Sequence, residues 1–199
     1  MNKIAKLKLY ALIDKATLKK NGKSLEWIVQ RAKSFDASLL QYRNKTGDFD
    51  EKKEDLLSIR KLCNDIPLII NDDITLIDYC DGIHLGQDDI LNFANDINKA
   101  ASLVRDIIGT KKLFGLSTHN TEEIVTANCL PIDYIGLGAY RKTNTKDTAN
   151  ILGDTLDLLA KFSKKPVAAI GGVKPHDEFK HVTYLVVGSG LYENYSILH

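Results

Sequence analysis

The sequence predicts a closed eight-stranded parallel barrel of the (β/α)8 or TIM type, formed as a single domain over residues 1–199. Eight short apolar runs recur along the chain, and helical patterns lie between most of them. The length of 199 residues falls at the lower end of the range for such barrels. An open doubly wound parallel sheet is the alternative fold, and it would place a ligand at the same ends of the strands.

The predicted strands are short apolar runs, as expected for parallel strands that are buried on both faces. They comprise residues 8–13, 38–43, 67–71, 82–85, 112–117, 133–138, 166–170 and 184–187. Apolar residues at helical spacing predict the intervening helices. These comprise residues 25–35, 49–64, 90–108, 121–129 and 151–162, with a short turn-and-helix segment at 75–80 and at most one last helix at 191–199.

The composition is that of a globular protein, because 44% of the residues are hydrophobic and 27% are charged. The formal net charge of +1 gives no reason to expect nucleic acid or an anionic membrane as partner. No apolar run reaches the roughly 20 residues of a membrane span, and the amino end lacks a signal peptide, so a cytoplasmic location is expected. The three cysteines, Cys63, Cys80 and Cys129, form no paired motif, and we expect them to be reduced and structural.

Acidic residues mark the ends of two neighbouring predicted strands. Asn71, Asp72 and Asp73 follow the third strand, and Asp88 and Asp89 follow the fourth. Ligands of parallel barrels bind where strands end, and Mg2+ typically takes one or two carboxylates from a protein. We therefore predict that Asp72 and Asp89 bind Mg2+. The alternative is that the acids cap the helices that follow, which is favoured for Asp73 and Asp88.

Three polar residues at alternate positions follow the second predicted strand. Gln41, Arg43 and Lys45 would face the same side if the extended backbone continues. Arg offers a planar fork to phosphate oxygens and Lys offers a point charge, so the three indicate a clamp for an anion. A solvated loop with scattered charge is the alternative, and it is favoured for Lys45 taken alone.

Polar residues also follow the fifth and sixth strands. Ser117 ends the fifth strand, and a polar loop at 139–148 follows the sixth. The hydroxyl, amide and cationic groups of this loop would extend the anion site: Arg141, Lys142, Thr143, Asn144, Thr145 and Lys146. A mobile surface loop is an equally good interpretation of this segment.

Glycines follow the last two strands, as Gly171-Gly172 and as Gly188-Ser189-Gly190. Glycine lets backbone amides approach a phosphate closely, and the seventh and eighth loops of such barrels commonly form that site. Tight barrel corners are the alternative. His84 and His119 lie near the same ends of the strands, but without a nucleophile at recognisable spacing, so a structural role is favoured for both.

Taken together, the segments resemble the thiamine-phosphate synthase family, which also includes a thiazole tautomerase branch. The matching motifs occur in the family's order between residues 10 and 190: Gln41-x-Arg43-x-Lys45, Asn71-Asp72-Asp73, residues 81–89, Gly115-Leu116-Ser117-Thr118-His119, Thr143-x-Thr145-Lys146 and Ile170-Gly171-Gly172. The resemblance implies small-molecule substrates. Hydroxymethylpyrimidine diphosphate would be joined to hydroxyethylthiazole phosphate, with release of pyrophosphate.

Residue roles follow from the resemblance position by position. Gln41, Arg43, Lys45, Asn71, Ser117 and Lys146 would hold the pyrimidine diphosphate, and Asp72 and Asp89 would bind Mg2+. Thr143, Thr145, Gly171 or Gly172, and the Gly188-Ser189 backbone would receive the thiazole phosphate. Arg43, Lys45, Ser117 and Lys146 would be the catalytic residues, and a homo-oligomer is compatible with the family.

The chain departs from the family pattern at residues 139–142, where Ala, Tyr, Arg and Lys replace the usual proline and aromatic residues. Two other functions are therefore compatible with the sequence. One is a thiazole tautomerase-like enzyme, against which the retained metal and diphosphate residues argue. The other is a non-catalytic protein that binds a phosphorylated ligand.

Overall fold

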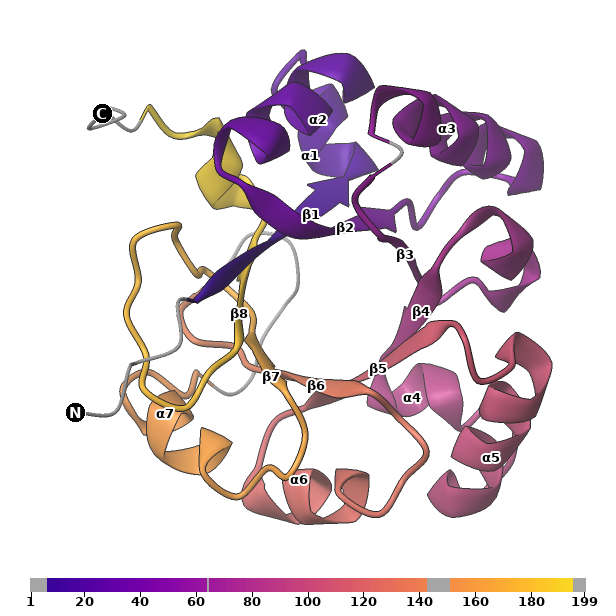
Figure 1. Cartoon of the computed structure of the whole chain (residues 1–199), viewed down its shortest axis with the longest axis vertical. Helices are drawn as coiled ribbons and strands as arrows, with labels where there is room; N and C mark the ends of the chain where they lie inside the picture. Colours follow the sequence, from indigo (N-terminus) through magenta and orange to yellow (C-terminus); the bar gives the residue numbers. More distant parts are fainter. Residues whose placement is uncertain (1–6, 64, 143–150, 195–199) are drawn as a thin grey trace.

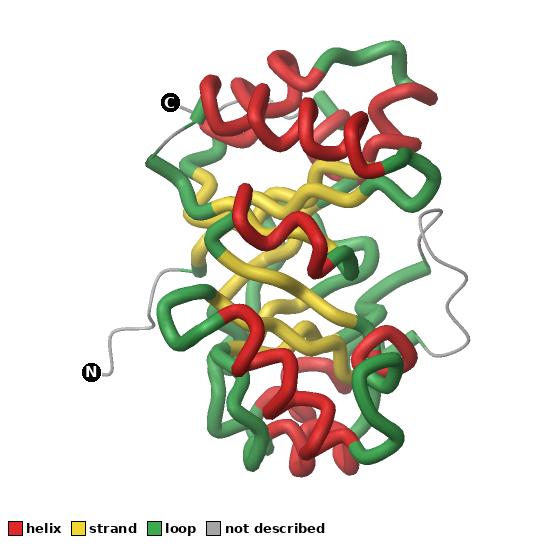
Figure 2. The backbone as a smooth tube through the Cα atoms, turned by 90° about the vertical axis from the view of Figure 1, so that its right-hand side faces the viewer, coloured by secondary structure: helices red, strands yellow, loops and turns green. Residues whose placement is uncertain are grey.

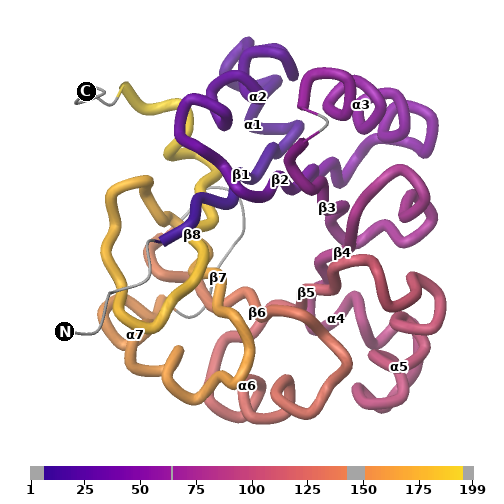
Figure 3. Tube along the Cα trace, in the orientation of Figure 1, coloured from indigo at the N-terminus to yellow at the C-terminus, as the bar shows by residue number. Residues whose placement is uncertain are grey.

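A computed structural model describes residues 7–63, 65–142 and 151–194. Eight parallel strands form a closed barrel in sequence order, and β8 pairs with β1 to complete the ring (Figures 1 and 3). The strands are β1 (Lys8–Asp14), β2 (Ala37–Arg43), β3 (Leu68–Asn71), β4 (Gly82–Leu85), β5 (Leu113–Thr118), β6 (Tyr134–Leu137), β7 (Val167–Ala169) and β8 (Tyr184–Val187). The predicted barrel is confirmed, and the open sheet is wrong.

Helices surround the ring of strands (Figures 1 and 2). They are α1 (Lys15–Lys20), α2 (Leu25–Ser34), α3 (Phe49–Leu62), α4 (Gln87–Ile90), α5 (Ile97–Ile108), α6 (Thr121–Ala127) and α7 (Thr155–Ala160), with 3-10 turns η1 (Ile74–Tyr79) and η2 (Ser189–Tyr192). In the described part of the chain, every helix is too short or too polar to cross a membrane.

The predicted continuous helix at 90–108 is wrong, because α4 ends at Ile90 and α5 begins at Ile97. Asp96 stops any continuation, since its backbone is extended and its side chain accepts the amide hydrogen of Lys99. Asp73 caps η1 as expected, through the amide of Thr75. Asp88 is not a cap, because Gly86 occupies the cap position of α4.

Two other helices differ from the prediction. The short helix α1 was not expected, and it begins because Asp14 accepts hydrogen bonds from the amide and hydroxyl groups of Thr17. α7 is shorter than the predicted helix at 151–162. Cys63 and Cys80 are buried and free, as a structural role requires, whereas Cys129 is exposed and does not pack in the core.

The inside of the barrel is filled at one end and hollow at the other. At the amino ends of the strands, buried side chains pack across the ring: Tyr10, Leu39, Ile69, Tyr134, Ala168 and Val186. Toward the carboxyl ends, several inward positions carry no side chain beyond hydrogen and border a cavity instead: Gly86, Gly136, Gly138 and Gly188. The barrel interior is therefore packed at the amino ends of the strands and open at their carboxyl ends.

An ion pair lies between the barrel and the first helices. Lys15 Nζ is 2.5 Å from Asp55 Oδ2, and the Tyr42 hydroxyl donates to the same oxygen. The side chains of Lys15 and Asp55 are only 18% and 12% exposed, so removing one charge would leave the other poorly solvated. The ion pair joins α1 to α3, and the Tyr42 hydrogen bond adds β2.

We expect Asp55→Ala to lower the free energy of unfolding by about 3 kcal/mol, because it removes the closer partner of the mostly buried Lys15 charge and the acceptor of the Tyr42 hydroxyl, leaving Lys15 only Glu51 at 3.6 Å. Urea unfolding followed by circular dichroism measures this loss. Glu54→Ala, at an exposed neighbour on the same helix, is the matched control and should change stability by less than about 0.5 kcal/mol. Equal effects of the two substitutions would contradict the structural role of the ion pair.

Candidate active site

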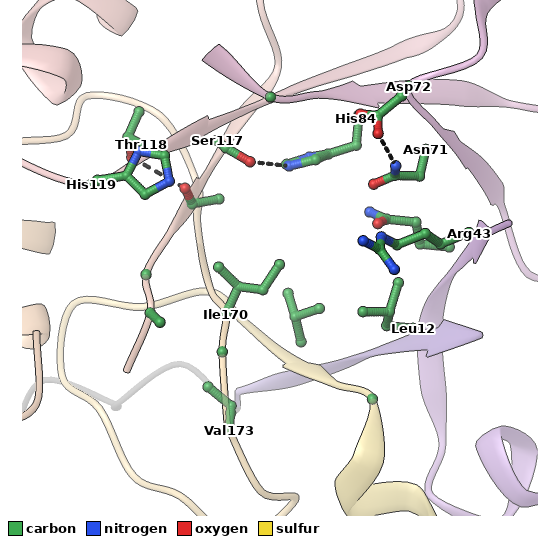
Figure 4. A pocket seen from close by; sticks show the side chains of 18 of the residues that line it. Leu12, Arg43, Asn71, Asp72, His84, Ser117, Thr118, His119, Ile170 and Val173 are labelled. Atoms are coloured by element: carbon green, nitrogen blue, oxygen red, sulfur yellow. Dashed lines mark hydrogen bonds between the residues drawn. The ribbon is translucent and has the colours of Figure 1, made fainter. Parts of the chain in front are cut away.

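A cavity of about 410 Å3 opens at the carboxyl ends of the strands (Figure 4). It is lined by every described residue to which the resemblance assigns a metal- or substrate-binding role: Gln41, Arg43, Lys45, Asn71, Asp72, Asp89, Ser117, Gly171, Gly172, Gly188 and Ser189. Arg141 and Lys142, which were expected to extend the anion site, do not line it. Thr143, Asn144, Thr145 and Lys146 lie outside the described residues. The structure thus brings the described residues together at one end of the barrel, and their individual roles stay predictions.

Two carboxylates from neighbouring strand ends come together in this cavity. Burial, and then the charge of Asp89, raise the pKa of Asp72 above that of an ordinary Asp. Asn71 Nδ2 donates to Asp72 Oδ2, and Lys45 Nζ lies 3.6 Å from the same oxygen. Asp72 has a φ of +64°, a left-handed conformation that Asp and Asn adopt more easily than other side chains. The backbone therefore holds this carboxylate beside Asp89 at the cost of electrostatic repulsion.

This carboxylate pair suits a hard divalent cation. Mg2+ takes one or two protein carboxylates and fills its other positions with water and phosphate oxygens. Within the described residues no group of three or more His, Cys, Asp or Glu side chains is arranged for a metal. A cation between Asp72 and Asp89 would relieve the repulsion that raises the Asp72 pKa, so the residues present fit Mg2+.

Arg43 is held in place by an acid that the sequence reasoning missed. Its Nη1 atom donates to Asp14 Oδ2 over 2.5 Å, and Asp14 is only 4% exposed. One edge of the guanidinium is thereby fixed, and its other donors remain for an anion in the cavity. A signal for Asp14 was present in the sequence. It is a polar residue directly after an apolar run, as Asn71 is, and such residues lie at the mouth of the barrel.

The two histidines differ in their surroundings. His84 is 4% exposed and lies within hydrogen-bonding distance of Tyr134 and Ser117, as expected of a structural residue. His119 has Nδ1 2.9 Å from Glu123 Oε2, and both histidines line the cavity. Glu123 also borders the cavity and was not identified from the sequence, where it could be recognised only as a helix-starting acid.

Arg141 does not extend the anion site. Both terminal nitrogens of its guanidinium donate to Asp177, over 2.6 and 2.8 Å, and Nη1 also donates to the Gly172 carbonyl. The Arg141 amide donates to the Gly171 carbonyl, so the segment after β6 lies along the segment after β7. The side chain therefore joins two loops at the edge of the cavity.

The two glycines after β7 are needed for this close contact. Gly171 and Gly172 have φ values of +85° and +67°, and a Cβ atom would lie 2.5 Å from Ala139 Cβ or 2.8 Å from Arg141 Cβ. At Gly171 and Gly172 the glycines are therefore needed for a tight corner of the barrel, which was the alternative interpretation. It does not exclude a phosphate site, because both glycines also line the cavity.

Polar and apolar side chains divide the cavity between them. Figure 4 shows Arg43, Asn71 and Asp72 gathered on one side, with Ile170 and Val173 on another. The apolar members were not identified as site residues from the sequence, because they look like ordinary core positions. The arrangement offers a charged end and an apolar end to one ligand or to a pair of ligands.

The closed ring of parallel strands, with a polar cavity at their carboxyl ends, defines a protein of the (β/α)8-barrel class. Residues 9–184 match the family model described as thiamine monophosphate synthase. The chain belongs to that family.

Relatives of known sequence agree with this assignment. The chain is 40% identical over 172 residues to the thiamine-phosphate synthase of Persephonella marina, covering 84% of this chain and 77% of that protein. It is 38% identical to the thiamine-phosphate synthase of Vibrio campbellii, covering 80% and 74% of the two chains. The solved structure of thiamine phosphate pyrophosphorylase from Pyrococcus furiosus has the same fold, with a TM-score of 0.71, 24% identity, and coverage of 92% and 86%.

We expect Asp72→Asn to raise the melting temperature of the metal-free protein by about 3 °C, or about 1 kcal/mol, because it removes the repulsion from Asp89. The raised pKa means that the folded protein binds the Asp72 proton more tightly than the unfolded chain. The destabilisation of the wild-type protein by the Asp72 charge therefore appears as pH rises above the ordinary carboxyl pKa of about 4. Below that pH, the two proteins should have the same melting temperature.

Added Mg2+ provides the opposite test by thermal melting. It should raise the melting temperature of the wild-type protein in proportion to the logarithm of its concentration, and it should have little effect on Asp72→Asn. Equal stabilisation of both proteins would show that Mg2+ binds elsewhere.

Proposed function

We propose that the chain transfers the hydroxymethylpyrimidine group from its diphosphate to 4-methyl-5-(2-phosphoethyl)thiazole, giving thiamine phosphate and pyrophosphate. It is a thiamine-phosphate synthase acting in the cytoplasm on small molecules. Membership of the thiamine monophosphate synthase family supports the reaction. The observation in the structure that best supports it is the pair of facing carboxylates beside Arg43 and Lys45 in one cavity.

The reaction breaks the bond between a methylene carbon and a diphosphate oxygen, and it forms a bond from that carbon to the thiazole nitrogen. The aminopyrimidine ring is electron-rich and can carry positive charge on the methylene carbon, so no strong base is needed. The protein must hold the diphosphate, stabilise the charge that develops on it, and align the thiazole nitrogen.

Asp72 and Asp89 would hold a Mg2+ ion, which when bound supplies positive charge to the departing diphosphate. Arg43 donates hydrogen bonds to the same anion, and Asp14 keeps its guanidinium at a fixed angle. Lys45 is 55% exposed on its side chain, so it can move between Asp72 and the diphosphate. The predicted contribution of Lys146 lies outside the described residues.

The remaining site residues are proposed to hold the rings and the second phosphate. Gln41, Asn71 and Ser117 line the cavity and offer hydrogen bonds to the pyrimidine diphosphate. The backbone at Gly171, Gly172, Gly188 and Ser189 would receive the thiazole phosphate, as would Thr143 and Thr145 from beyond the described residues.

The alternatives have less support. A thiazole tautomerase acts on a monophosphate and has little use for two carboxylates with Arg43 and Lys45 around one cavity. A non-catalytic binding protein would not need the repulsion between Asp72 and Asp89 that a cation relieves.

We expect the purified protein, with both substrates and Mg2+, to form thiamine phosphate and pyrophosphate in equal amounts. Asp89→Asn should lower kcat/KM by about 100-fold or more, because it removes one of the two metal-binding charges. Removal of Mg2+ with EDTA should stop the reaction, and added Mg2+ should restore it in the wild-type protein. Thiamine phosphate is measured by chromatography and pyrophosphate by a coupled assay.

Asp88→Asn is the matched control, because Asp88 neighbours Asp89 on α4, carries the same charge and is exposed. It should keep wild-type activity. Isomerisation of a thiazole phosphate without coupling would favour the tautomerase. Tight ligand binding without pyrophosphate release over hours would favour the binding protein.

A further inference from the structure

A chain of hydrogen bonds crosses the floor of the cavity. Gln41 Nε2 donates to the Tyr10 hydroxyl over 2.7 Å, and the hydroxyls of Tyr10 and Tyr134 are 2.9 Å apart. The Tyr134 hydroxyl lies 3.1 Å from His84 Nδ1, and His84 Nε2 lies 3.0 Å from Ser117 Oγ. The chain links β2, β1, β6, β4 and β5 in turn, and both of its ends line the cavity.

The members of the chain are enclosed by the barrel. Gln41, Tyr10, Tyr134 and His84 are 2%, 0%, 3% and 4% exposed. Burial raises the pKa of the Tyr10 and Tyr134 hydroxyls well above the ordinary value, so both stay protonated at any working pH. The two tyrosines therefore act only as neutral donors and acceptors.

The barrel leaves room for the chain at two glycines. A Cβ atom at Gly115 would lie 2.2 Å from Tyr134 Cζ and 2.5 Å from His84 Nδ1. A Cβ atom at Gly136 would lie 2.9 Å from His84 Cε1. Any larger residue at these positions would push the His84 ring away from its partners.

The donor at Gln41 sets the direction of every later hydrogen bond. The Tyr10 oxygen accepts from Gln41, and within the described residues Tyr134 is the only acceptor within reach of the Tyr10 hydrogen. A chain in which every hydrogen is used therefore has Tyr10 donating to Tyr134 and Tyr134 donating to His84 Nδ1. With Nδ1 accepting, the His84 hydrogen is on Nε2 and is donated to Ser117 Oγ. The Ser117 hydroxyl hydrogen is then left to point elsewhere, and this hydroxyl borders the cavity.

We propose that Tyr10 and Tyr134 are positioning residues, which fix His84 in the form protonated on Nε2 and thereby make Ser117 a hydrogen-bond donor to the ligand. At the other end, the hydrogen bond to Tyr10 is the only one that the Gln41 side chain makes within the described residues. Its amide oxygen is thus left as an acceptor.

The two ends of the chain define what the ligand must offer. A ligand held here accepts a hydrogen bond beside Ser117 and donates one beside Gln41. An aminopyrimidine has ring nitrogens that accept and an exocyclic amine that donates, so its ring fits this polarity. This identification of the ligand rests on the proposed function, whereas the direction of the chain does not.

The test uses Tyr134→Phe, which removes one hydroxyl and keeps the ring. In protein labelled with 15N-histidine, with the His84 signals assigned through His84→Gln, the wild-type protein should show an unprotonated Nδ1 and a protonated Nε2. Tyr134→Phe should shift the Nδ1 resonance. It should raise KM for the pyrimidine diphosphate about 10-fold, as expected for one lost hydrogen bond, and leave KM for the thiazole phosphate unchanged.

Tyr184→Phe is the matched control, because the Tyr184 ring packs edge-on against both tyrosines while the chain does not pass through it. It should leave the His84 resonances and both KM values unchanged. Thermal melting checks that each variant is folded, and Tyr10→Phe replaces Tyr134→Phe if the latter is not.

Three results would overturn the proposal: a proton on Nδ1 in the wild-type protein, an unchanged Nδ1 resonance in the folded Tyr134→Phe, or equal increases of both KM values in Tyr134→Phe and Tyr184→Phe. If neither the wild-type protein nor Tyr134→Phe couples the substrates, but the Nδ1 resonance still differs between them, the proposed function is wrong and the positioning role of the tyrosines is supported.

Discussion

The structure depends on how the inward positions of one closed ring of strands are filled. A parallel barrel of eight strands has an interior just wide enough for side chains, so each inward residue either packs the core or leaves space. Tyr10 and Tyr134 meet across the ring at the amino end, whereas Gly188 leaves space at the other end and Gly136 makes room for the His84 ring beside the cavity. The same closure that stabilises the fold therefore creates a cavity at one mouth.

Most of the fold could be predicted from the sequence, because buried parallel strands leave a strong local pattern. All eight strands were placed, and the errors fall where local chemistry overrides apolar spacing. The segment between Ile90 and Ile97 has enough apolar residues to continue a helix, yet Asp96 begins a new one. α1 was missed because its start depends on Asp14, which directly follows the predicted first strand at residues 8–13 and was given no role.

The part of the site that could be predicted consists of polar residues directly after apolar runs. Asp72, Asp89 and Arg43 are of this kind, and their neighbours in the fold follow from the order of the strands. The site residues that were missed act through hydrogen bonds to partners far away in the sequence. Tyr10 and Tyr134 are 124 positions apart and look like core aromatics, so nothing local indicates that their hydroxyls meet. Arg141 is the opposite case, because it looked like an anion-binding residue in a polar loop but is paired with Asp177 in the structure.

Asp14 uses its two carboxylate oxygens for two different purposes. Oδ1 accepts from Thr17 and starts α1, while Oδ2 accepts from Arg43 in the cavity. Loss of the arginine would leave a buried negative charge at the first turn of that helix. Reduced turnover in an Arg43 variant would thus combine a missing contact with an Asp14 carboxylate that only Thr17 still holds. By thermodynamic linkage, an anion that orders the guanidinium should also protect the α1 amides from hydrogen exchange.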